Sequence, residues 1–84
     1  MSKENALPSI DRGPLRFNAI SQRWEIRGAI TGTLLHEITS GDVVFVDVGG
    51  EMKLTRIEHS SQNGYYSIDG YRLSDGIEAA LPNA

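Results

Sequence analysis

Residues 43–57 read VVFVDVGGEMKLTRI, with two glycines between a valine-rich run and a charged, β-branched run. A phosphate-binding glycine loop needs backbone N–H groups that converge at the start of a helix, but a strand pattern follows Gly50. Two adjacent glycines instead supply the positive φ angles of a type I′ turn. We therefore predict a β-hairpin in which Gly49 and Gly50 form the turn.

The turn fixes the register of this hairpin, from Val48 opposite Glu51 to Val43 opposite Arg56. The run before the turn is apolar on both of its faces, which is typical of a strand in the middle of a curled sheet. We expect residues 43–48 to form the central strand of the fold.

The second strand of the hairpin carries apolar side chains on both faces. Leu54 lies on one face of the predicted strand and Ile57 lies on the other. Because the apolar positions change face between these residues, we predict a bulge or sharp bend near Thr55 and Arg56, as in small barrels.

Turn signals recur at short intervals on both sides of this hairpin, and Asn63-Gly64 predicts a second hairpin that continues it into a meander. Trp24 and Ile26 alternate with charged residues, so we predict a strand with Trp24 in the core. The whole pattern predicts an all-β fold, a small, strongly bent antiparallel β-barrel of SH3-like size with about six short strands. Residues 33–38 allow either a strand or one short helix.

The ends and the composition of the chain constrain its organisation. Residues 1–12 are polar and lack periodicity, which predicts a flexible N-terminal arm before a single β domain at 13–84. The 84 residues contain no cysteine, which fits a reducing compartment. The longest apolar run, at 43–46, is too short to span a membrane. We therefore expect a cytoplasmic protein without a membrane partner, either a monomer or a weak homodimer.

The charge is distributed unevenly along the chain. Residues 1–36 contain five Lys/Arg and three Asp/Glu, whereas residues 37–84 contain three and eight. An acidic balance argues against nucleic acid as the main partner, because binding to phosphates depends on a basic patch. Arg16, Arg23 and Arg27 lie close together in sequence and are the candidates for a local basic patch.

No catalytic or metal-binding motif emerges from the sequence. His36-Glu37 begins like H-E-x-x-H, but Ser40 stands where the second histidine is required, and His59 lies on a different predicted strand. No serine has the G-x-S-x-G setting of a nucleophile. We predict that the protein is not an enzyme and has no cofactor, no metal and no catalytic residue.

Charged and aromatic residues are concentrated on the predicted C-terminal strands and their turns. Arginine and tyrosine are the side chains that most often anchor protein–protein contacts. Aspartates in turns have a structural explanation as well, because they stabilise the turn itself. The predicted partner-binding residues are Arg56, Glu58, Tyr65, Tyr66, Asp69, Tyr71 and Asp75. Tyr65 and Tyr66 must point to opposite sides of their strand, and the sequence leaves open which of them is outside.

Several short elements resemble a family of small bacterial domains catalogued as a domain of unknown function. The resemblance extends from Gly13 to about Ala80, and a tryptophan expected before Thr55 in that family is absent here. The elements are GPLRFN at 13–18, RWEI at 23–26, ITSGD at 38–42, TRIEH at 55–59, GYY at 64–66 and LSDGI at 73–77.

The resemblance implies a genetic context, because such domains look like cargo of phages, plasmids and conjugative elements. Small acidic proteins of this origin are often inhibitors of host defence, including anti-CRISPR proteins. We therefore expect a non-catalytic module that binds a host protein or nucleoprotein complex, to whose basic channel clustered carboxylates would be complementary. The alternative is a small accessory β-barrel that binds nucleic acid through Arg16, Arg23, Arg27 and an exposed ring.

Overall fold

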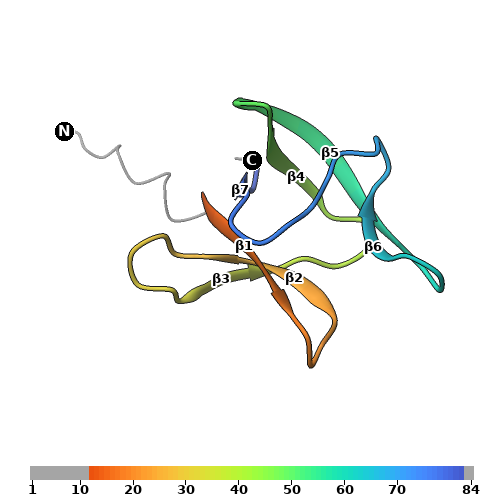
Figure 1. Ribbon diagram of the computed structural model, residues 1–84, viewed down its shortest axis with the longest axis horizontal. Helices are drawn as coiled ribbons and strands as arrows, with labels where there is room; N and C mark the ends of the chain where they lie inside the picture. The colour runs from red at the N-terminus through yellow and green to blue at the C-terminus, as the bar shows by residue number, and fades with distance from the viewer. Residues whose placement is uncertain (1–11, 83–84) are drawn as a thin grey trace.

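The computed structural model describes residues 12–82, which form one antiparallel sheet (Figure 1). Its seven strands are β1 (Arg12–Asn18), β2 (Arg23–Arg27), β3 (Leu34–Glu37), β4 (Val43–Val48), β5 (Glu51–Ser60), β6 (Gly64–Ser67) and β7 (Glu78–Ala80). Their order across the sheet is β3-β2-β1-β7-β4-β5-β6. The predicted all-β antiparallel class is confirmed, with seven strands instead of about six.

The sheet bends strongly because its two longest strands each change partner along their length. β1 pairs with β7 through its first residues and with β2 through its last ones. β5 pairs with β4 through its first half and with β6 through its second half. The bend brings β6 near β2, but β3 and β6 remain the two edges of the sheet. The predicted closure into a barrel is therefore wrong, and the sheet has an open seam between β2 and β6.

The hairpin of β4 and β5 has the predicted register, from Val48 opposite Glu51 to Val43 opposite Arg56. Gly49 and Gly50 have φ angles of 63° and 92°, as the predicted turn requires. Neither pairing of β5 has a register shift, so of the predicted bulge or sharp bend near Thr55 and Arg56 the bulge is absent. β5 instead changes partner here, from β4 at Arg56 to β6 at Ile57. The register shift of this sheet lies instead between β2 and β3, at Ile26 and Arg27.

A small apolar core fills the concave side of the bent sheet. Its members come from six different places in the chain, and they are Leu15, Ile26, Ile38, Val44, Val46, Ile57 and Ala79. Trp24, predicted to be a core residue, is only partly buried and packs against this cluster from one side. Gly13 is required where β1 passes the end of β2, because a Cβ at this position would lie 1.8 Å from the carbonyl oxygen of Arg27.

The remaining segments settle the alternatives left by the sequence. Residues 34–37 form strand β3, so the short helix considered at 33–38 is not present. Of the arm predicted at 1–12, Arg12 belongs to β1 and the other residues lie outside the described range. Residues 12–82 contain no helix with the length and apolarity that a membrane span requires.

Candidate protein-binding surfaces

The convex side of β4, β5 and β6 carries exposed apolar side chains. Along β4 and β5, residues 44, 46, 55 and 57 face the core, so the alternate residues face outward. Leu54 is 52% exposed, and Ile68, which follows β6, is 49% exposed. We define the outer face as Val43, Phe45, Met52, Leu54, Tyr66 and Ile68.

Charged side chains border the outer face. Arg56 and Glu58 follow Leu54 on the same side of β5 and form an ion pair, with 3.1 Å between Nε and Oε2. Tyr66 lies directly opposite Glu58 on β6. An apolar centre with arginine, carboxylate and tyrosine at its border is the composition of many protein interfaces. Three of the predicted partner-binding residues, Arg56, Glu58 and Tyr66, therefore lie together on one surface.

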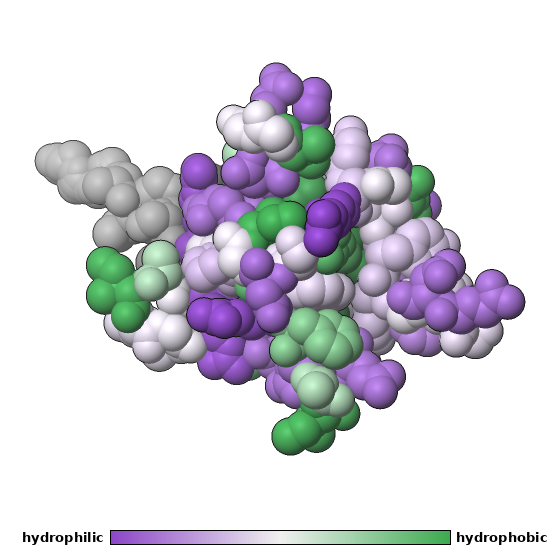
Figure 2. Space-filling view, in the orientation of Figure 1, coloured by the Kyte–Doolittle hydropathy of each residue, from purple (hydrophilic) through white to green (hydrophobic). Residues whose placement is uncertain are grey.

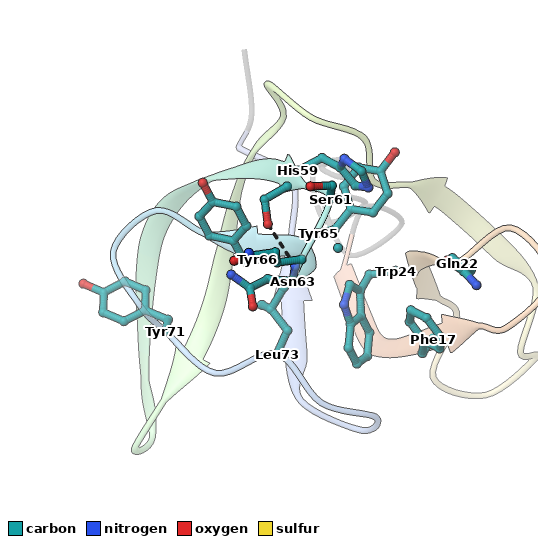
Figure 3. A pocket seen from close by; sticks show the side chains of 13 residues that line it. Phe17, Gln22, Trp24, His59, Ser61, Asn63, Tyr65, Tyr66, Tyr71 and Leu73 are labelled. Atoms are coloured by element: carbon teal, nitrogen blue, oxygen red, sulfur yellow. Dashed lines mark hydrogen bonds between the residues drawn. The ribbon is translucent and has the colours of Figure 1, made fainter.

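A groove of about 580 Å³ lies between the β1–β2 hairpin and the β5–β6 hairpin, at the open seam of the sheet (Figure 3). Each hairpin contributes one cross-strand pair of rings. Phe17 and Trp24 meet edge to face, with ring centroids 5.2 Å apart. His59 lies against Tyr65, with centroids 4.7 Å apart. Tyr71 lines the same groove but points away from the Phe17–Trp24 pair.

Arg23 connects the groove to both edges of the sheet. Its guanidinium carbon lies 5.8 Å from the centroid of the Tyr65 ring on β6, within the range of a cation–π contact. Its Nη1 atom lies 3.5 Å from Oε1 of Glu37 on β3. Arg23 therefore links the two edge strands from its position at the start of β2.

The other four predicted partner-binding residues lie neither on the outer face nor at its border. Tyr65 and Tyr71 line the groove. Asp69 accepts a hydrogen bond from the Thr55 hydroxyl at 2.7 Å, and Asp75 accepts one from the backbone N–H of Phe17 at 2.8 Å. The structure therefore divides the predicted site into an outer face, a groove and two aspartates that hold loops.

Two arginines of the predicted basic patch, Arg23 and Arg27, are paired with carboxylates. Arg27 donates two hydrogen bonds to Oε1 of Glu25, at 3.0 Å and 2.7 Å, and Arg23 pairs with Glu37. Two hydrogen-bond partners hold the pKa of the buried Glu25 carboxyl below its ordinary value of 4.5. The larger effect comes from the Asn18 side-chain amide and the smaller one from Arg27. Glu25 is therefore a charged partner for Arg27 at neutral pH.

Apolar side chains also stand out at the tips of the β1–β2 turn and the β2–β3 loop, as Figure 2 shows. They include Ile20 and Ile30, which is 98% exposed. Because these two isoleucines stand singly at different ends of β2, neither forms part of an extended patch.

Sequence reasoning missed the apolar members of both surfaces. The sequence pattern predicts apolar residues on both faces of the β4–β5 hairpin without showing which face is exposed, and it predicts Trp24 as a core residue. The signal that identifies the outer face is the hairpin register itself, which places Phe45 opposite Leu54 on the side away from Val44 and Val46.

A family model described as "Domain of unknown function (DUF5348)" matches residues 13–81. Searches of the curated proteins and of the solved structures found no match. Among residues 12–82, no three side chains of the His, Cys, Asp and Glu types lie together as a metal-binding cluster.

Proposed function

Because this chain belongs to the DUF5348 family, whose function is unknown, we propose its function from its surfaces: a non-catalytic module that binds a partner protein through its outer face. The observation that carries the proposal is the half-exposed Leu54 at the centre of an apolar sheet face. A small domain that leaves such a face in water gives up stabilisation that burial would supply, at about 25 cal/mol per Å². Contact with a partner recovers that free energy.

The border of the outer face supports a protein partner over a membrane or a small molecule. Arg56 and Glu58 supply one positive and one negative charge beside the apolar centre, and Tyr66 adds a ring with a polar end. Groups of this kind exclude water from the centre of an interface and fix its register.

The partner class that we propose is a host protein or nucleoprotein complex, and the origin a phage or another mobile element. This choice of partner and origin is supported by the sequence resemblance and by the acidic composition of residues 37–84, which contain eight Asp/Glu and three Lys/Arg. A carboxylate-rich surface is complementary to a basic nucleic-acid channel, which is the part of a defence nuclease that an anti-CRISPR-like inhibitor would block.

An alternative function is binding of nucleic acid by a small accessory protein. The contact between Arg23 and the Tyr65 ring favours it, because single-stranded nucleic acids bind to rings beside cations. The pairing of Arg23 and Arg27 with carboxylates weighs against it. A gel shift at about 50 mM salt separates the two functions, since electrostatic affinity for phosphates is high under that condition.

The test of the proposed function compares two substitutions of exposed apolar residues. The tagged chain is used to capture proteins from a bacterial lysate, alongside Leu54→Ser on the outer face and Ile30→Ser at the tip of the β2–β3 loop. We expect a stoichiometric protein partner with the wild type and with Ile30→Ser, and at least about tenfold less with Leu54→Ser. No stoichiometric partner, or equal capture by both variants, would contradict the proposal.

A further inference from the structure

The groove at the open seam differs from the outer face in its side chains, which are aromatic and polar. We propose that this groove binds a proline-rich segment of another protein in the polyproline II conformation. This inference goes beyond the proposed function, since it assigns a second site with its own ligand class. Only Tyr66 borders both surfaces.

The ring pairs of the groove provide the apolar half of this recognition. Phe17 and Trp24 form one wall, and His59 and Tyr65 form another, so that two sets of rings face one open channel (Figure 3). Grooves lined by aromatic rings accept the flat pyrrolidine rings of a polyproline II helix. The ligand is already rigid in this conformation and loses little entropy on binding.

The polar groups between the rings fit the backbone of such a ligand. A polyproline II helix makes no internal hydrogen bonds, so its carbonyl groups need donors. The indole N–H of Trp24 and the hydroxyl of Tyr65 are donors in the lining of the groove. Figure 3 draws one hydrogen bond among the lining residues, from the backbone N–H of Asn63 to the Ser60 hydroxyl, and neither ring donor takes part in it.

The uncharged lining of the groove disfavours nucleic acid, which also binds to aromatic rings. None of its lining residues is Lys, Arg, Asp or Glu. An uncharged lining matches an uncharged proline-rich segment, whereas a nucleic acid needs several cations along its backbone. Arg23, whose guanidinium lies over the Tyr65 ring, is paired with Glu37.

Trp24 is the only tryptophan of the chain, so its fluorescence reports on the groove. The full-length protein is titrated with blocked deca-L-proline, with blocked deca-D-proline of the same composition, with a blocked Gly-Ser decapeptide and with the oligonucleotide dT10. We expect a saturable change in emission with deca-L-proline and at least about tenfold weaker binding of the other three. No response to deca-L-proline, an equal response to either control peptide, or tighter binding of dT10 would overturn the inference.

Variants then locate the binding site. Tyr65→Ala should weaken binding of deca-L-proline about tenfold, because one ring pair is lost. Tyr65→Phe keeps the ring and should weaken binding of deca-L-proline about threefold, because one hydrogen-bond donor is lost. If Tyr65→Ala fails to fold, Tyr65→Phe decides alone. Unchanged affinity in the deciding Tyr65 variant would overturn the inference.

Leu54→Ser separates this inference from the proposed function. It should bind deca-L-proline like the wild type while it loses the captured partner. Loss of peptide binding in Leu54→Ser would show that the groove is not a separate site, and normal peptide binding without any captured partner would contradict the proposed function alone.

Discussion

Glu25 is the residue whose environment departs most from that of an ordinary surface carboxylate. It lies in a charged stretch of β2, yet the residue is only 4% exposed. Asn18 donates a hydrogen bond to Oε2 at 3.0 Å, and Arg27 donates two to Oε1. A buried carboxylate is stable only with such partners, since leaving it unpaired would cost several kcal/mol. The charged form of Glu25 thus holds the β1–β2 hairpin together.

The lowered pKa of Glu25 makes the stability of the protein depend on pH. Because the pKa in the folded state is below the ordinary value of 4.5, the unfolded chain binds this proton first as the pH falls. The stabilising contribution is complete above the unfolded pKa and is lost as the pH falls through the folded pKa. We expect the free energy of unfolding, measured with urea between pH 7 and pH 3, to fall more steeply in the wild type than in Glu25→Gln. Parallel profiles for the two proteins would contradict this role.

At the scale of the elements, β5 determines how the sheet bends. Thr55 is paired with Val44 of β4, two residues before β5 begins to pair with β6 at Ile57. Its hydroxyl donates to Asp69 at 2.7 Å, and it accepts the proton of the Ser67 hydroxyl, also at 2.7 Å, because Thr55 has only one proton to donate. This buried chain of hydrogen bonds joins β5, β6 and the turn after β6.

Thr55→Val removes the hydroxyl and keeps the shape of the side chain. Ser67 then loses its acceptor in a buried place, so we expect the free energy of unfolding to fall by about 1–2 kcal/mol. Thr55→Ser is the control, since it keeps the hydroxyl and loses only a methyl group. Urea denaturation measures both variants. The interpretation fails if Thr55→Val is as stable as the wild type or more stable than Thr55→Ser.

At the scale of the whole molecule, the open seam distinguishes this fold from a closed barrel. β3 and β6 are edges, and Arg23 connects them through Glu37 and Tyr65. Exposed contacts of this kind contribute only about 0–1 kcal/mol each. They are sufficient to hold a local edge in place but not to determine the global stability, so we expect the seam to open more readily than the core.

Arg23→Gln should therefore act locally. We expect amide hydrogen exchange at Tyr65 and its neighbours in β6 to become about fivefold faster, while exchange at Val44 and Val46 in β4 changes little. Arg72→Gln, at an exposed arginine outside the strands, is the matched control for the loss of charge. Equal acceleration in β4 and β6, or no change in β6, would show that Arg23 does not hold the seam.

Much of the fold was predictable from the sequence because it depends on local geometry. The two glycines at 49 and 50 require positive φ angles, and a two-residue turn fixes every pair from Val43 to Arg56. Alternation similarly identified the strand at 23–27. The candidate residues Arg56, Glu58 and Tyr66 were found as members of one surface because they follow each other along this same meander.

The sequence by itself therefore determined the class of the fold, the hairpins and their register, since these follow from the conformational preferences of adjacent residues. Only the tertiary structure decided that the sheet stays open, that Phe45 and Leu54 face outward, and that Trp24 lines a groove. The physical reason is that burial depends on which strands meet across the molecule. A pattern of apolar residues is the same whether the face that it forms is covered by the chain itself or left for a partner.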